Sequence, residues 1–283
     1  MNRVAPHAYR RIEVRRIAGA LGAEIHGVDV SGPLAEEIIA EIRQAFLDHQ
    51  VVFLREQKLA PQRLLAFAQQ FGQPMEYPQL KGLPECPLVT PVIKLEHERV
   101  NFGGVWHSDT TYLERPPMAS ILYAVETPPV GGDTIFASQY LAYEALSEGL
   151  KRMLAGVIGI NSSTKAEVSR SREDRLREAG VEHKALIGEH PVVRTHPETG
   201  RKALYVNAGH TAHFKGFTAE ESAPLLGYLF SHQVRPEFTC RFHWEPGSLA
   251  FWDNRCTQHN PVNDYHGFRR LMHRVTLAGD TPR

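Results

Sequence analysis

The segment Trp106-His107-Ser108-Asp109 is the first part of the chain whose residue types could do chemistry. If it forms a strand, residues i and i+2 project from the same face, so the imidazole of His107 and the carboxylate of Asp109 point at one ion. Two ligands hold a metal weakly, and a His-x-Asp tripeptide often occurs by chance. A third ligand must therefore come from elsewhere in the chain.

His259 is a third ligand of a suitable type. It follows a strand-like segment and lies 150 positions after Asp109 (259 − 109). Two histidines and one carboxylate that leave coordination positions open form the facial triad of non-haem Fe(II) oxygen chemistry. Such a centre needs the open positions because a co-substrate and O₂ must both reach the metal. We therefore predict His107, Asp109 and His259 as metal ligands, with Asp253 or Asn254 bracing a ligand segment from outside.

Two arginines beyond His259 could hold anions. A guanidinium presents a planar fork that matches a carboxylate in two parallel hydrogen bonds. Arg270 could hold the far carboxylate of a 2-oxo acid whose other end chelates the metal. Arg274 lies four residues further on, and strand alternation puts both side chains on one face. The alternative is that these arginines, with Arg269, are exterior charges.

A zinc site is a second interpretation of this region, because Cys256-x-x-His259 could be half of one. No second Cys/His pair has matching spacing, so the sequence disfavours a closed structural zinc site.

The overall composition limits the class of protein. Of 283 residues, 42% are hydrophobic and 23% are charged, which predicts a folded core. Lys plus Arg equals Asp plus Glu at 32 each, which argues against a nucleic-acid or membrane-surface role carried by net charge. The scattered Cys86, Cys240 and Cys256 form no disulfide framework. The charged N-terminus and the lack of a long apolar run predict a soluble, cytoplasmic protein.

Strand-like segments dominate the second half of the chain, and helical periodicity is found mainly in the first. We expect one domain over 1–283, of α+β or mainly β class, built as a sandwich or jelly roll with helices packed on the outside. The charged stretch 164–185, within 160–190, is either a solvated helix or excursion or a lid, and 77–101 is loop-like. The expected helices are 34–48, 62–71, 141–154 and 219–231, and the expected strands are 51–54, 105–112, 120–125, 134–136, 191–195, 203–207, 239–243, 248–252 and 271–277.

An ordered set of motifs resembles the TauD/TfdA family of taurine and 2,4-D dioxygenases. The likeness extends from Leu21-Gly22-Ala23-Glu24-Ile25 to His273-Arg274. The set is specific, although no single motif is; its members are His107-Ser108-Asp109, Gly131-Gly132-Asp133-Thr134, Trp252-Asp253-Asn254-Arg255, His259 and Arg270. The resemblance implies a double-stranded β-helix (jelly roll), Fe(II) held by the three predicted ligands, and 2-oxoglutarate held by Thr134 and Arg270.

The resemblance also bears on the substrate. It implies that Arg274 grips the anionic group of the primary substrate. Four positions differ from the taurine-binding pattern, in which a His, a Tyr, an Asn and a Phe are usual; here they are Tyr77, Leu80, Gly103 and His210. Taurine is therefore disfavoured. Arg274, the anion-binding arginine of the family pattern, is present here, and it would suit another sulfonate, a sulfate ester or an aryloxyalkanoate.

The implied activity is hydroxylation of a small anionic organic substrate with O₂, releasing succinate and CO₂. A product hydroxylated beside sulfur or oxygen would collapse to a carbonyl compound plus sulfite, sulfate or phenol. The alternatives are a 2-oxoglutarate-dependent hydroxylase of an amino acid or biosynthetic intermediate, and a non-catalytic jelly-roll binding protein. A homo-oligomer, dimer or tetramer, is compatible with the sequence.

Overall fold

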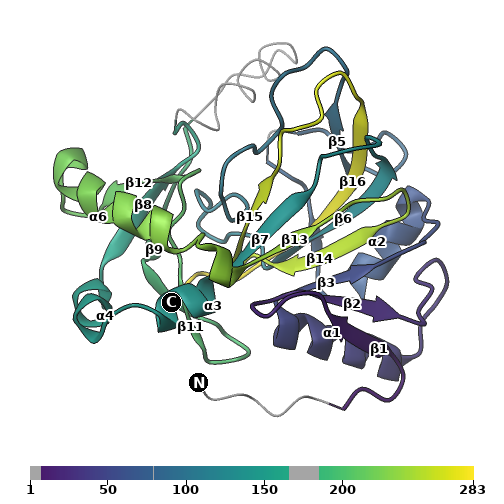
Figure 1. Ribbon diagram of the computed structural model, residues 1–283, viewed down its shortest axis with the longest axis horizontal. Helices are drawn as coiled ribbons and strands as arrows, with labels where there is room; N and C mark the ends of the chain where they lie inside the picture. Colours follow the sequence, from purple (N-terminus) through teal and green to yellow (C-terminus); the bar gives the residue numbers. More distant parts are fainter. Residues whose placement is uncertain (1–7, 79, 166–184) are drawn as a thin grey trace.

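A large mixed sheet lies in the right half of the molecule in Figure 1. The structure, a computed structural model, describes residues 8–78, 80–165 and 185–283. The sheet has the order β1-β2-β3-β14-β6-β16-β4, with β5 also paired to β16; β2 and β3 run parallel. Its strands are β1 Glu13–Arg16, β2 Ala23–His26, β3 Val51–Leu54, β4 Pro74–Met75, β5 Thr90–Lys94, β6 Ala119–Glu126, β14 Leu249–Asp253 and β16 Arg270–Leu277.

A smaller sheet, in the order β13-β7-β15, packs against the inner face of the large one. Side chains from both sheets form one buried cluster between them, since alternate strand residues point inward. Phe53 of the large sheet stacks on Phe242 of the small one, with ring centroids 3.9 Å apart, and contacts Phe136 edge-on at 5.7 Å. The strands are β7 Thr134–Ser138, β13 Thr239–Phe242 and β15 Thr257–Pro261.

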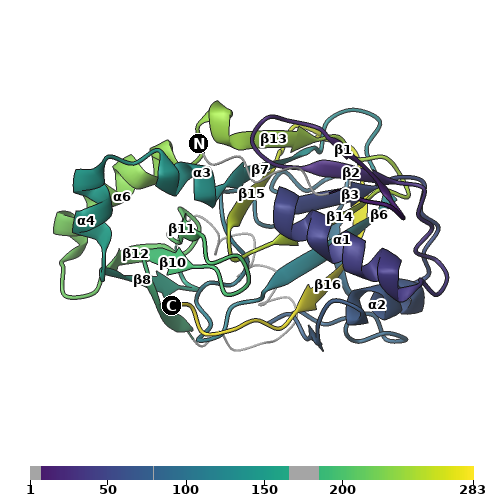
Figure 2. The ribbon, with the colours of Figure 1, turned by 90° about the horizontal axis from the view of Figure 1, so that it is seen from below.

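Two helices cover the outer face of the large sheet (Figure 2). Helix α1, Glu36–His49, has Glu36 and Glu37 in its first turn, where carboxylates favour the positive helix end. Helix α2, Pro61–Gln69, begins with proline at a position that needs no N–H donor. Phe46 of α1 stacks on Phe251 of β14 at 4.1 Å, so β14 is buried on both faces.

The other helices and short strands of the described residues form a separate cluster, on the left in Figure 1. Its sheet has the order β12-β8-β9, beside the hairpin β10-β11. The elements are β8 Ile158–Ser162, β9 Ile187–Pro191, β10 Val193–Thr195, β11 Lys202–Leu204, β12 Thr211–Phe214, α3 Gln139–Glu144, α4 Glu148–Leu154, α6 Ala219–His232 and the 3₁₀ turn η1 Pro236–Phe238.

The mainly β class with helices on the outside agrees with the sequence prediction, but the predicted strand over 105–112 is wrong. In the structure this segment is a loop, and its strand-type backbone pairing is an isolated bridge between His107 and His259. Ser108 Oγ donates to the carbonyl of Thr257, Thr111 Oγ1 donates to Asn161 Oδ1, and Thr110 has a φ of 42°, outside the extended region. These hydrogen bonds to distant residues, together with the turn at Thr110, hold the segment in a loop rather than in a strand ladder.

Two other predicted elements need correction. The single helix expected over 141–154 is two helices, because Ser147 accepts a hydrogen bond from the N–H of Leu150 and starts α4 anew. The loop-like region 77–101 contains β5, which includes Pro91. A proline is tolerated there because β5 pairs only with β16.

The excursion or lid predicted over 160–190 falls largely on residues 166–184, which lie outside the described residues.

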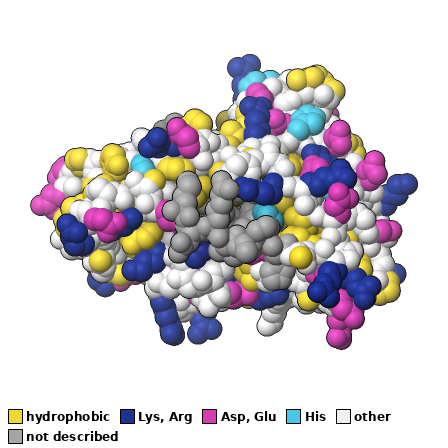
Figure 3. Space-filling view, turned by 60° about the horizontal axis from the view of Figure 1, so that its bottom comes forward, with side chains coloured by type: hydrophobic (Ala, Val, Ile, Leu, Met, Phe, Trp, Pro, Cys, Tyr) yellow, Lys and Arg dark blue, Asp and Glu magenta, His cyan; other side chains and the backbone are white. Residues whose placement is uncertain are grey.

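Among the helices of the described ranges, none has the length and apolar character of a membrane span. On the face in Figure 3, acidic and basic side chains are interspersed, in keeping with a formal net charge of zero.

The cluster between the sheets predicts a large effect of Phe53→Ala. Phe53 is 0% exposed and contacts two aromatic rings across the layers, so its truncation should lower the free energy of unfolding by about 3–5 kcal/mol. Urea denaturation followed by circular dichroism measures the change. Phe268→Ala is the control, because Phe268 is 44% exposed and should change stability by less than about 0.5 kcal/mol. Equal effects of the two variants would contradict the assignment of the core.

Candidate active site

A direct backbone pairing joins two of the predicted metal ligands. The N–H of His107 donates to the carbonyl of His259 at 3.1 Å, and the N–H of His259 donates to the carbonyl of His107 at 2.8 Å. Residues that exchange both hydrogen bonds in this way project their side chains to the same face. The two imidazole centroids are 4.2 Å apart. Because β15 is paired with β7 through His259 and Phe136, this arrangement is fixed to the small sheet.

Asp109 completes a buried cluster with the two histidines. Its Oδ1 lies 3.8 Å from Nε2 of His107 and 4.0 Å from Nε2 of His259, and the three ligand atoms lie within 4.8 Å of one another. First-row metal bonds of roughly 2.1 Å place neighbouring ligand atoms roughly 3 Å apart, so an ion would draw the three side chains slightly inward. The three residues therefore fit one divalent ion.

Both histidines present a nitrogen suited to a metal. Nδ1 of His107 lies 2.7 Å from the carbonyl oxygen of Val105, which only accepts, so Nδ1 carries the proton and Nε2 keeps its lone pair. Burial, followed by the neighbouring His107, lowers the pKa of His259 to about 3. A neutral imidazole is the form that binds metals.

Asp109 is braced so that one carboxylate oxygen is left for a metal. Its Oδ2 accepts hydrogen bonds from Ser120 Oγ at 2.6 Å and from Asn254 Nδ2 at 3.2 Å. The Asn254 Oδ1 in turn accepts from the N–H of Asp109 and from Trp252 Nε1. Burial raises the pKa of Asp109, but the charge of Arg274 and the hydrogen bond from Ser120 act against burial, and the net pKa is well below its usual value. The carboxylate is therefore ionised.

Asp253 or Asn254 was expected to support a ligand segment. In the structure Asn254 is the one that hydrogen-bonds Asp109. Ser120 was not predicted, although a serine within the apolar strand segment Ala119-Ser120-Ile121-Leu122 is a signal that could have found it. A buried hydroxyl on the inner face of a strand needs a polar partner.

Asp253 belongs to a second buried cluster, with His196 and Cys256. His196 Nε2 lies 3.0 Å from Asp253 Oδ2, while Arg255 forms a two-pronged ion pair with the same carboxylate. His196 Nδ1 accepts the N–H groups of Glu198 and Thr199, so its lone pair is used. This cluster is a satisfied hydrogen-bond network. Cys256 belongs to this cluster and His259 to the other, so the zinc interpretation of Cys256-x-x-His259 finds no shared site.

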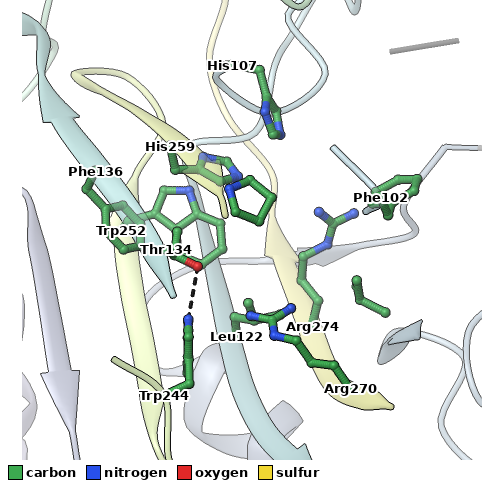
Figure 4. Close-up of a pocket in the computed structure, with 12 residues that line it drawn as sticks. Phe102, His107, Leu122, Thr134, Phe136, Trp244, Trp252, His259, Arg270 and Arg274 are labelled. Atoms are coloured by element: carbon green, nitrogen blue, oxygen red, sulfur yellow. Dashed lines mark hydrogen bonds between the residues drawn. The ribbon is translucent and has the colours of Figure 1, made fainter. Parts of the chain in front are cut away.

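A cavity opens beside the histidines (Figure 4). Its volume is about 470 Å³, including the part open to solvent. The predicted metal ligands His107 and His259 lie at one end, and the predicted anion-binding residues lie along its wall. The lining residues are Val92, Phe102, His107, Leu122, Thr134, Phe136, Trp244, Trp252, His259, Pro261, Arg270 and Arg274.

Thr134 and Arg270 face this cavity with unused donors. Trp244 Nε1 donates to Thr134 Oγ1 at 2.9 Å, which leaves the threonine hydroxyl proton free to donate to a ligand. Nε and Nη2 of Arg270 are buried and have no hydrogen-bond partner among the described residues. Those two nitrogens form the side fork that a carboxylate matches. The pair therefore fits the far carboxylate of 2-oxoglutarate.

Arg274 forms a second cationic fork next to the metal ligands. Burial pattern and strand register place it with Arg270 on the inner face of β16. Its guanidinium stacks on the ring of Tyr77 at 3.6 Å, and its Nη1 lies 3.4 Å from Asp109 Oδ1. Its Nε and Nη2 have no hydrogen-bond partner within the described ranges. An anion could be bound here beside the metal.

The remaining predicted substrate residues differ in position. Gly103 has a φ of 73°, and a Cβ built on it would lie 2.9 Å from Cε1 of His107. His210 is buried, with its ring centroid 5.9 Å from that of His107 and its Nδ1 3.1 Å from Thr111 Oγ1. Leu80 is half-buried, hydrogen-bonds through its backbone to Tyr77, and does not line the cavity. Tyr77 therefore lies against Arg274, and Gly103 and His210 lie beside His107; a role for Leu80 stays a prediction.

Comparison with known proteins identifies the class. Residues 13–276 match the family described as taurine catabolism dioxygenase TauD, TfdA family. An alpha-ketoglutarate-dependent sulfate ester dioxygenase from Pseudomonas putida is 36% identical, with 98% of this chain and 93% of the relative covered. An alkylsulfatase from Acinetobacter baylyi is 35% identical, covering 96% and 86%. The crystal structure of a taurine dioxygenase from Burkholderia xenovorans is similar, with a TM-score of 0.82, 38% identity and coverage of 96% and 91%.

The chain belongs to the TauD/TfdA family of dioxygenases. The family resemblance and the oxidoreductase class predicted from the motifs are thereby confirmed, and the non-catalytic binding protein is disfavoured.

The close approach at Gly103 predicts that Gly103→Ala weakens metal binding. The added methyl group would press on the His107 ring, and φ at this position is one that residues with a side chain rarely adopt. We expect at least a tenfold rise in the dissociation constant for Mn(II), measured by isothermal titration. Gly104→Ala is the matched control, because its Cβ would meet only ordinary contacts at 3.6 Å. Unchanged binding in Gly103→Ala would refute the steric argument.

The brace at Asn254 predicts a loss of metal affinity in Asn254→Ala. The change removes a hydrogen bond to Asp109 Oδ2 and leaves the N–H of Asp109 and Trp252 Nε1 without an acceptor. Loss of such a supporting residue weakens metal binding by roughly 10–100-fold. Mn(II) titration, with circular dichroism to verify folding, checks this. Asn263→Ala removes a hydrogen bond to the carbonyl of Arg99 and none to a triad residue, so it should leave the affinity intact; a similar loss there would contradict a specific role of Asn254.

Proposed function

We propose that the chain is an Fe(II)- and 2-oxoglutarate-dependent dioxygenase that hydroxylates a small anionic organic substrate, with sulfate esters as the first candidate class. The observation that carries this proposal is the pair of buried arginines with unused forks on one wall of a cavity that ends at the triad. One fork suits the co-substrate and the other the substrate. Family membership supplies the requirement for Fe(II), 2-oxoglutarate and O₂.

For the fold, we propose that the two facing sheets are a double-stranded β-helix, or jelly roll, within a single domain over 1–283. The buried cluster shared by both sheets supports this proposal, since each sheet supplies half of one core. A dimer or tetramer remains a prediction.

For the metal, the proposed ligands are His107, Asp109 and His259. Iron, 2-oxoglutarate and O₂ together supply the oxidising power that hydroxylates a carbon while 2-oxoglutarate becomes succinate and CO₂. The chain's part is to keep His259 neutral and Asp109 ionised, to direct Nε2 of His107 to the site, and to supply only three ligands, which would leave positions on a bound ion for the co-substrate and O₂. The backbone pairing of His107 with His259 holds the two rings on one side of the site.

For the co-substrate, Arg270 and Thr134 hold the far carboxylate and so set the distance of the 2-oxo group from the triad. Trp244 fixes the threonine hydroxyl so that its proton is directed to the ligand. This orientation, together with apolar walls such as Leu122 and Phe136 that exclude water, is the protein's contribution to the rate.

For the primary substrate, Arg274 binds the anionic group, with Tyr77 holding the guanidinium in place by stacking. Similarity to a sulfate ester dioxygenase at 36% identity, together with the four departures from the taurine pattern, supports sulfate esters over taurine. Hydroxylation of the carbon that bears the sulfate oxygen gives a product that collapses. The hydroxyl loses its proton, a C=O bond forms, the C–O bond to sulfate breaks, and sulfate leaves.

Succinate release with a panel of substrates tests the proposal. We expect release that depends on Fe(II) and on an alkyl sulfate ester, disappears with a chelator, and is weak with taurine. Arg270→Ala should raise the KM for 2-oxoglutarate, whereas Arg274→Ala should raise the KM for the sulfate ester first, each by roughly 10-fold or more for loss of a charged hydrogen-bonding group. If each variant raised the KM for 2-oxoglutarate and the KM for the sulfate ester equally, the division of roles between Arg270 and Arg274 would be refuted.

A further inference from the structure

A smaller pocket lies beside Arg270 and connects with the main cavity. The two share four lining residues, Val92, Phe102, Pro261 and Arg270. The smaller pocket adds the polar side chains of Lys94, Asn101 and Tyr265. Nothing in the family motifs quoted above includes these three residues. The far end of the co-substrate site is therefore more polar than Thr134 and Arg270 alone would make it.

Lys94 and Arg270 are directly opposed cations. They are partners in the antiparallel pairing of β5 with β16, and directly opposed residues project to the same face. Lys94 is 3% exposed and Arg270 is 5% exposed. Two like charges placed opposite each other and away from water repel, and low polarity strengthens this repulsion.

The described residues supply little to balance these charges. Lys94 Nζ is buried without a hydrogen-bond partner among them, as are Nε and Nη2 of Arg270. The carboxylate of Asp133, which acts on Arg270 at a distance, is already paired with Arg241 at 2.6 Å and His243 at 2.8 Å. The pocket therefore attracts an anion.

Contacts with neutral groups offset only part of this imbalance. Lys94 Nζ lies 4.5 Å from the centroid of the Tyr265 ring, a cation–π contact. Asn101 donates its Nδ2 to the carbonyls of Pro261 and Val262, which fixes the amide orientation and leaves Oδ1 as an unused acceptor. The aromatic face of Tyr265 orients the ammonium group of Lys94 but does not neutralise it.

We propose that Lys94 is a second cationic contact for the far carboxylate of the 2-oxo acid, acting with Arg270 and Thr134. This inference rests on the proposed function and adds a residue to it. An ionised carboxylate has about four acceptor positions. The Arg270 fork takes two and the Thr134 hydroxyl takes one, which leaves one for the ammonium. Lys94 thus favours dicarboxylic 2-oxo acids over those that lack the second carboxylate.

The test uses the full chain loaded with Mn(II) and compares binding of 2-oxoglutarate with binding of 2-oxobutyrate, which lacks the far carboxylate, by isothermal titration. Lys94→Met keeps the length of the side chain and removes the charge. We expect it to weaken 2-oxoglutarate binding by roughly 10–100-fold and to leave 2-oxobutyrate binding unchanged. Lys58→Met, at an exposed position, is the control and should change neither.

Thermal unfolding of the ligand-free protein gives a second measurement. Removal of a buried cation that opposes Arg270 should keep or raise Tm in Lys94→Met, whereas 2-oxoglutarate should raise Tm less than in the unaltered protein. A lower Tm together with equal weakening of both 2-oxo acids would assign Lys94 a structural role and overturn the proposal. Unchanged 2-oxoglutarate binding in Lys94→Met would also overturn the proposal. It would mean that a water molecule, and not the carboxylate of the 2-oxo acid, is the partner of the Lys94 ammonium group.

Failure of the proposed function has a different signature. If the unaltered, Mn(II)-loaded protein does not bind 2-oxoglutarate, both the function and the role of Lys94 are refuted. If it binds and Lys94→Met behaves as the unaltered protein does, only the role of Lys94 is refuted.

Discussion

The backbone bridge between His107 and His259 is the constraint on which the site depends. It joins residues 152 positions apart (259 − 107) through two hydrogen bonds, so the relative placement of two ligands is set by main-chain geometry rather than by flexible side chains. His259 is also within a strand paired to β7, which carries Thr134 at its first position. The same short sheet therefore positions the metal ligands and one end of the co-substrate site.

A second theme is charge that the fold leaves unbalanced. Arg270, Arg274 and Lys94 are all buried, and each has N–H groups without a partner among the described residues. Burying such groups is unfavourable unless anions meet them. By contrast, Asp253 and Arg255, equally buried, satisfy each other and His196. The Asp253, Arg255 and His196 cluster is therefore complete without a ligand, whereas the three buried cations are suited to binding anionic ligands.

The sequence predicted the chemistry of the site better than its local structure. The three residues proposed as a triad do lie within 4.8 Å of one another, and strand alternation does put Arg270 and Arg274 on one face of β16; their roles toward a metal and its ligands stay predictions. The loop conformation around Asp109 was missed, since Thr110 and its hydrogen-bonded neighbours override a strand-like pattern. Lys94 and Ser120 were missed for another reason: their importance arises from partners on other strands, Arg270 and Asp109, that spacing along the chain does not reveal.

The absence of a side chain at Gly103 limits how this enzyme can be altered. In the taurine pattern an asparagine occupies this position, yet here the space for its Cβ is filled by the ring of His107. Engineering toward taurine by restoring that one residue would therefore disturb the iron centre itself. Retargeting at this position would therefore require a new backbone path for the loop from Asn101 to Trp106 as well as a new side chain.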